Sequence, residues 1–270
     1  MKKLQTHRAK SLWLAAAGSF CLALPITHAV QVDLASGDSG SVNGALFQWT
    51  AEQPTGTGFI DPFVRIQNNG VEQGYNTSGR PFAFDQKEPL NYTHDIQVSQ
   101  LGAGVTVDGV DYYQFLLDIN EPGGNKSLLS MDALQFYTSP TGSKTTSDVG
   151  SLGTLRYDLD MGADSWVLLD ASRNSGSGSG DMFAFIPKSA FAGASADDFV
   201  YLYSKFGENV TAEGGAEAGF EEWAVVASSG GGGGAGPIPE PSTYLLLGSF
   251  LTLAVFLKRR RQSQTTDSQS

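Results

Sequence analysis

The sequence predicts an all-β fold: a single antiparallel β-sandwich of jelly-roll type, between an N-terminal signal helix and a C-terminal transmembrane helix. Two observations lead to this. In the middle of the chain, short stretches of alternating apolar and polar residues are separated by turn-forming residues. At each end of the 270-residue chain, one apolar run lies next to basic residues, as in targeting and anchoring segments.

Residues 1–29 have the three parts of a secretory signal peptide. Lys2, Lys3, Arg8 and Lys10 precede an apolar run over residues 12–24, and a small-x-Ala pattern ends at Ala29. An apolar helix of about 13 residues is only ~20 Å long and falls short of a ~30 Å hydrocarbon core. We therefore expect cleavage after Ala29 and a mature domain over residues 30–227.

The strand candidates of this domain share a period of two and are bounded by Gly, Asn, Asp, Ser or Pro. They are residues 45–50, 64–67, 81–85, 96–99, 110–119, 132–138, 154–159, 165–170, 181–186, 199–204 and 222–227. The sequences Asn68-Asn69-Gly70 and Asp108-Gly109 suit tight hairpins, because both tolerate positive φ. A helical turn is expected over 187–191, with Pro187 at its first position. So many short strands without a periodic helix indicate a sandwich.

Charge and cysteine content narrow the function of the domain. It has nine basic residues against 26 acidic ones, a net charge near −17, which repels nucleic acid and anionic lipid. The only cysteine, Cys21, lies in the signal segment, so disulfides, thiolate metal sites and cysteine nucleophiles are excluded from the mature domain. Its one histidine, His94, is interpreted as a turn or surface residue.

The chain after residue 227 changes character. Residues 228–236 form a Gly/Ser linker, and 237–261 combine a proline-rich stretch with an apolar run and a basic cluster. A transmembrane helix is predicted over 242–257, followed by a polar cytoplasmic tail over 262–270. The positive-inside rule keeps the basic cluster in the cytoplasm and the domain outside.

This C-terminal pattern resembles the PEP-CTERM protein-sorting signal. The resemblance rests on Pro239, Glu240, Pro241, Ser242 and Thr243, and then on Lys258, Arg259, Arg260 and Arg261. It implies recognition by an exosortase, a transpeptidase in the inner membrane of Gram-negative bacteria that make exopolysaccharide. Cleavage near Pro-Glu-Pro and transfer to the cell surface or matrix would follow. This domain type is also labelled as that of ice-binding proteins, but the sequence has no regular Thr-x-Thr array for an ice-binding face.

Two oxygen-rich segments are candidates for calcium. Asp158, Asp160 and Asp164 alternate around Gly162, and short alternating oxygen ligands beside a glycine turn suit Ca²⁺. The EF-hand pattern fails, because Leu169 stands where the bidentate glutamate is needed. The alternative interpretation is a solvated acidic turn. The second segment contains Asp118, Asn120, Glu121 and Asn125.

No residue set indicates catalysis. Glu221 and Glu222 are adjacent, so on a strand they point to opposite faces and cannot form a glycosidase dyad. Aromatic residues suit a sugar-stacking platform but are better explained as core: Tyr112, Tyr113, Tyr137, Trp166, Tyr201, Tyr203 and Trp223. The sequence thus predicts an exported, non-enzymatic surface or matrix protein. The alternatives are a carbohydrate- or calcium-binding module of the exopolysaccharide matrix and a secreted hydrolase.

Overall fold

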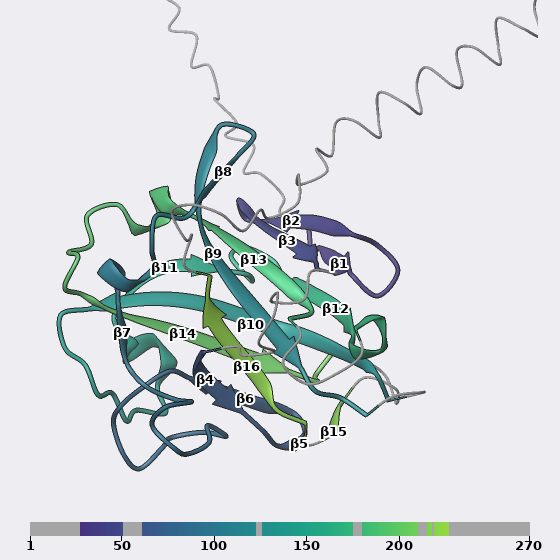
Figure 1. Cartoon of the computed structure of the whole chain (residues 1–270), viewed down its shortest axis with the longest axis horizontal. Helices are drawn as coiled ribbons and strands as arrows, with labels where there is room; N and C mark the ends of the chain where they lie inside the picture. Colours follow the sequence, from purple (N-terminus) through teal and green to yellow (C-terminus); the bar gives the residue numbers. More distant parts are fainter. Residues whose placement is uncertain are drawn as a thin grey trace, which may run out of the picture.

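A computed structural model describes residues 28–50, 61–122, 126–174, 180–209, 215–217 and 219–226. Strands dominate this part of the chain (Figure 1), and the predicted all-β class is confirmed. The helical elements among these residues are short 3-10 turns: Val98–Gln100, Val149–Leu152, Ala171–Arg173 and Lys188–Phe191.

The first sheet has seven strands, with β10 and β14 at its centre. Its path runs β1-β12-β10-β14-β6, while β11 also pairs with β10 and β7 with β14. All of these pairings are antiparallel except that of β1 with β12. The strands are β1 (Gln31–Asp33), β6 (Glu72–Tyr75), β7 (Ile96–Gln97), β10 (Leu128–Ser139), β11 (Thr154–Asp158), β12 (Trp166–Asp170) and β14 (Phe199–Phe206).

The second sheet also has seven strands and is antiparallel throughout. Its path runs β2-β3-β13-β9-β16-β4, and β8 also pairs with β9. The strands are β2 (Ser39–Val42), β3 (Ala45–Trp49), β4 (Pro62–Ile66), β8 (Val105–Val107), β9 (Val110–Ile119), β13 (Met182–Pro187) and β16 (Glu221–Val225). A small separate pair joins β5 (Asn69–Gly70) to β15 (Ala216–Glu217).

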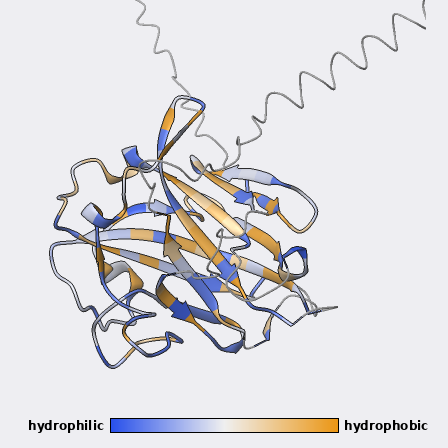
Figure 2. Cartoon of the chain, viewed as in Figure 1, coloured by the Kyte–Doolittle hydropathy of each residue, from blue (hydrophilic) through white to orange (hydrophobic). Residues whose placement is uncertain are grey.

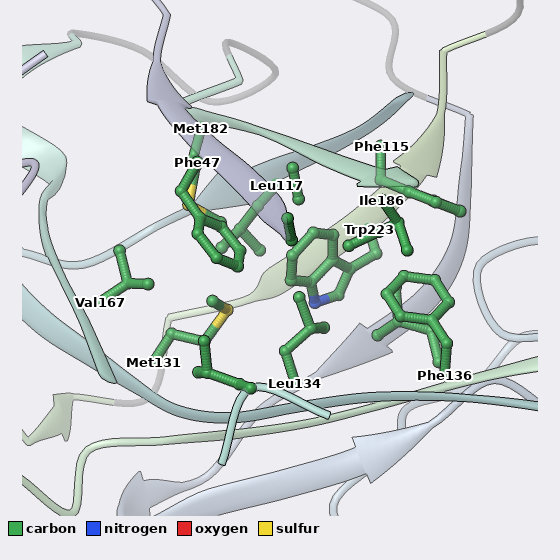
Figure 3. Packing of buried hydrophobic residues seen from close by; sticks show 14 of the residues in the cluster. Phe47, Phe115, Leu117, Met131, Leu134, Phe136, Val167, Met182, Ile186 and Trp223 are labelled. Carbon is green, nitrogen blue, oxygen red and sulfur yellow. The ribbon is translucent and has the colours of Figure 1, made fainter. Parts of the chain in front are cut away.

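One hydrophobic core unites side chains from both sheets. Phe115, Leu117 and Trp223 from the second sheet and Met131, Leu134 and Phe136 from the first belong to the same buried cluster (Figure 3). Figure 2 shows long apolar stretches on β9 and β13, the neighbouring strands in the middle of the second sheet. The core also contains a polar link between the sheets, because the indole Nε1 of Trp223 donates to Ser204 Oγ of β14 at 3.1 Å.

The strand predictions agree with the structure except at 81–85, which is not a strand. Pro81 has no amide hydrogen, and the amide of Phe84 donates to the side chain of Gln86 at 2.9 Å instead of to a neighbouring strand. The predicted strand at 96–99 is shorter than expected, because a 3-10 turn begins at Val98. The predicted turn near Pro187 forms over Lys188–Phe191, and Pro187 itself ends β13.

Of the two predicted hairpins, one is confirmed and one is wrong. Asp108 and Gly109 have φ of 50° and 79° and connect the paired strands β8 and β9. The segment Asn68-Asn69-Gly70, in contrast, carries the chain from β4 in the second sheet to β6 in the first. Asn69 and Gly70 pair instead with Glu217 and Ala216. This change of sheet brings the start of β6 to the same end of the sandwich as β15.

Candidate functional site

Three glutamates interact between the sheets. They lie toward the end of the sandwich at which Figure 1 shows β5 and β15. Glu221 begins β16 and is in register with Ile119 of β9 and Ile66 of β4, whose side chains are in the core. Because directly opposed residues of a sheet share a face, Glu221 also points inward. Trp223, two residues further along the strand, lies on that same inner face (Figure 3).

The other two glutamates come from different parts of the chain. Glu72 begins β6 and is in register with Phe206, a buried core residue of β14, so it faces inward from the first sheet. Glu121 follows β9, two residues beyond Ile119. We refer to Glu72, Glu221 and Glu121 as the glutamate row, because Glu221 interacts directly with both of the others.

The glutamate row is deeply buried and short of hydrogen-bond donors. Glu72 and Glu221 are 0% exposed and Glu121 is 8% exposed. One oxygen of Glu72 accepts the amide of Asn68 at 2.6 Å, and the Glu121 carboxyl accepts the amide of Glu217 at 2.9 and 3.2 Å. The other oxygen of Glu72 and both oxygens of Glu221 have no donor among the described residues.

No described basic side chain donates a hydrogen bond to these carboxyls, although the charge of Lys87 partly opposes the rise in the pKa of Glu72. All nine basic residues of the domain are described, and none donates to the glutamate row. Arg156 donates to the hydroxyl of Thr138 and to the carbonyl of Ala192. Lys188 donates to the carbonyl of Ala103. Five others form ion pairs elsewhere: Arg65 with Glu222, Arg80 with Glu88, Lys126 with Glu217, Arg173 with Asp38 and Lys205 with Glu208.

Burial is the main cause of the altered acidity of the row. It raises the pKa of Glu121 to about 7, raises that of Glu72, and raises that of Glu221 well above the ordinary value of 4.5. Negative neighbours act in the same direction, since Glu72 and Glu121 both disfavour charge on Glu221. The row therefore needs protons or a cation to remain buried at neutral pH.

The predicted calcium residues Asp158, Asp160 and Asp164 lie at the end of β11 and in the turn after it. Asp158 Oδ1 accepts the amide of Asp160 at 3.0 Å, and Asp160 Oδ1 accepts the amide of Ser165 at 2.9 Å. Burial raises the pKa of Asp160 to about 6. These bonds stabilise the turn itself, and calcium binding at this position stays a prediction.

The second oxygen-rich segment divides between different surroundings. Glu121 joins the glutamate row, whereas the side-chain amide of Asn120 donates to the carbonyl of Phe220 at 3.0 Å. Asn125 lies outside the described residues. Across the residues described, no group of three or more His, Cys, Asp or Glu side chains is arranged to hold a metal ion.

The remaining sequence candidates are placed as follows. Glu221 and Glu222 point to opposite faces as predicted, Glu221 into the core and Glu222 to an ion pair with Arg65. Glu72 and Glu221 are fully buried, so a sugar has no access to these two carboxyls. His94 is half-buried in the loop just after the turn at residues 90–92, and its Nδ1 lies 3.0 Å from the carbonyl of Leu90.

The aromatic residues divide between core and partial exposure. Tyr112, Tyr113 and Trp166 are half-buried. Tyr137, Tyr201, Tyr203 and Trp223 are buried, as the core interpretation predicts. Trp223 belongs to the main core, and the three tyrosines form a second cluster with Tyr75 and Leu152. The sugar-platform interpretation therefore has little exposed aromatic surface to use.

Sequence reasoning missed Glu72 and treated Glu221 only as half of an adjacent pair. For Glu221 a signal existed, because Trp223 stands two residues later and so shares its face in a strand. Glu72 carried no such signal, since its position depends on the chain changing sheets at Asn68–Gly70.

The targeting segments are only marginally covered by the structure. Ala29, the predicted cleavage residue, is exposed. The predicted signal helix, the linker, the transmembrane segment and every residue of the sorting motif lie outside the described residues. In the ranges that are described, we find no helix with the length and apolarity to cross a bilayer. Comparisons with family models, curated proteins and solved structures gave no match.

Proposed function

We propose that this protein is an exported, non-enzymatic component of the cell surface or extracellular matrix, sorted through a C-terminal PEP-CTERM signal. One observation carries the proposal. A Pro-Glu-Pro stretch, a short apolar run and an arginine cluster occur in that order near the C-terminus, after a Gly/Ser tether and downstream of a signal peptide. Each part has a separate physical role in secretion, and together they imply the same orientation across the membrane.

In this proposal the domain is carried across the inner membrane behind the signal peptide. The segment 242–257 holds it there with the C-terminus in the cytoplasm, until an exosortase cleaves near Pro239-Glu240-Pro241. The released domain is a single β-sandwich of jelly-roll type, and the core shared by two seven-stranded sheets supports that assignment. A cysteine-free domain suits this route, because its folding does not depend on disulfide formation.

Variants of the sorting motif test this function in the producing bacterium. Replacing Pro239, Glu240 and Pro241 together by alanine should leave the protein in the inner-membrane fraction and reduce the amount at the surface at least several-fold. A matched triple change in the polar tail, Ser263→Ala, Thr265→Ala and Thr266→Ala, should leave surface delivery unchanged. Equal surface delivery of the motif variant and the natural chain would contradict sorting through this motif.

A second function, a calcium-binding module of the exopolysaccharide matrix, is favoured by the glutamate row. Three buried carboxyls that accept no hydrogen bond from a described basic side chain are suited to oxygen coordination of a cation. Calorimetric titration of the protein with the purified polysaccharide, with and without Ca²⁺, tests the carbohydrate part of this alternative. Absence of heat in both titrations would leave the module without a polysaccharide ligand.

A further inference from the structure

The glutamate row joins three segments that are distant in the sequence. Glu72 enters from the first sheet, Glu221 from the second, and Glu121 from the loop after β9. Immediately beside them, the bond between Trp223 and Ser204 already connects the two sheets. A ligand held by the row would therefore connect the same two sheets at the end of the sandwich.

The row has an excess of acceptors that the surrounding protein does not satisfy. Only the amides of Asn68 and Glu217 donate to it, and three of the carboxyl oxygens have no donor in the described part of the chain. An unpartnered buried carboxylate is costly, by several kcal/mol per ion even after relaxation. Glu221 is the extreme case, because it is fully buried, neither of its oxygens has a donor among the described residues, and the groups it interacts with are the carboxyls of Glu72 and Glu121.

A divalent cation would neutralise these carboxyls better than the side chains around them do. All nine basic residues of the domain are among the described residues, and none of them donates a hydrogen bond to the row; Lys87 acts through its charge on Glu72, at one end of the row. Glu221 lies between two further carboxyls, so an ion at its oxygens would meet negative charge on either side. Attraction between opposite charges is strong where water is excluded.

The donor set selects the kind of cation. The row offers only oxygen atoms, which suit Ca²⁺ and Mg²⁺ and not the softer metals that prefer His or Cys. Mg²⁺ keeps several waters in a strict octahedron, whereas Ca²⁺ accepts six to eight oxygens in irregular geometry with bidentate carboxylates. Because Glu72 and Glu221 have no exposed surface, few waters can accompany the ion, and this favours Ca²⁺.

We propose that Glu72, Glu121 and Glu221 bind one Ca²⁺ ion between the two sheets, with Glu221 as the central ligand. In the structure the three carboxyls form a row and not a closed shell, so binding requires the outer two to turn toward Glu221. The ion then replaces shared protons as the neutralising charge and ties both sheets to the loop after β9. This inference concerns the domain alone and is independent of the sorting signal.

Thermal unfolding of the full chain in detergent, followed by tryptophan fluorescence, tests the site. After treatment with EDTA, millimolar CaCl₂ at pH 7.5 and constant ionic strength should raise the unfolding temperature by roughly 5–10 °C, and MgCl₂ should do markedly less. In Glu221→Gln this shift should disappear, whatever the stability of the variant without calcium. Asp160→Asn, in the turn after β11, is the matched control and should keep the full shift.

Each other outcome overturns the proposal. No shift with Ca²⁺ in the natural chain would mean that protons alone neutralise the row. An equal shift in Glu221→Gln and in the natural chain would mean surface binding, or binding at the Asp158 turn if Asp160→Asn loses the shift. If Glu221→Gln does not fold, Glu121→Gln at the edge of the row replaces it with the same expectation. Terbium luminescence sensitised by Trp223 gives a second measurement, and it should be displaced by Ca²⁺.

Discussion

Glu121→Gln should remove a defined part of the pH dependence of folding. The pKa of Glu121 is about 7 in the folded protein, chiefly because of burial, against an ordinary value of 4.5. Between these values the folded state retains a proton that the unfolded chain has released. The free energy of unfolding therefore falls as pH rises through this window and is highest below it.

The size of the effect follows from the two pKa values. A difference from 4.5 to about 7 corresponds to about 3 kcal/mol between the two limits. Because the sequence pI is near 4.6, measurements are best kept above it, from pH 5.5 to 8. About 2 kcal/mol of the loss falls within that range, since the unfolded chain is already mostly ionised at pH 5.5. The raised pKa values of Glu72 and Glu221 act with the same sign.

Urea unfolding of the natural chain and of Glu121→Gln, both in EDTA, measures this contribution. Glutamine keeps an oxygen for the amide of Glu217 but does not titrate. Between pH 5.5 and 8 the variant should lose about 2 kcal/mol less stability than the natural chain. Asp197→Asn changes an exposed aspartate and should follow the natural chain. The same pH dependence in Glu121→Gln and in the natural chain would show that Glu121 does not hold the retained proton.

Two further substitutions test the fold. Trp223→Phe should destabilise the domain by about 2–4 kcal/mol, measured by urea unfolding, because it opens a cavity and leaves Ser204 without its donor. Ser204→Ala should cost about 1–3 kcal/mol, and a larger loss than that of Trp223→Phe would contradict the assignment. Gly109→Ala should cost about 1–2 kcal/mol through its positive φ alone, since no atom lies within 4 Å of an added Cβ. Gly150→Ala, where the added Cβ makes only an ordinary contact, should be nearly neutral.

The sequence predicted the strands well where periodicity is local. Residues 110–119 form β9 with the predicted bounds, because Tyr113, Phe115, Leu117 and Ile119 recur at every second position along it. Strands with weak side-chain signals were missed, such as β6, whose sequence Glu-Gln-Gly-Tyr has no apolar alternation. The hairpin at Asn43-Gly44 was also missed. In the structure both residues have positive φ and join β2 to β3.

The glutamate row lay beyond sequence reasoning for a different reason. Local patterns indicate which face a residue occupies, but not which face of another sheet it will meet. Glu72 and Glu221 are opposed only because the chain changes sheets between β4 and β6. The segment Asn68-Asn69-Gly70 has the composition of a hairpin turn in either case, so composition could not distinguish a hairpin from this crossing. Glu121 was recognised as a candidate ligand, but with partners near it in sequence.

Mass spectrometry of the protein recovered from the surface or matrix of the producing cells shows directly whether both ends of the chain are removed. If the chain is exported and sorted through its PEP-CTERM tail, the mature protein begins at Val30 and contains neither residues 1–29 nor residues 242–270. Recovery of a C-terminus intact to Ser270 would contradict the sorting claim and would make the tail an ordinary membrane anchor.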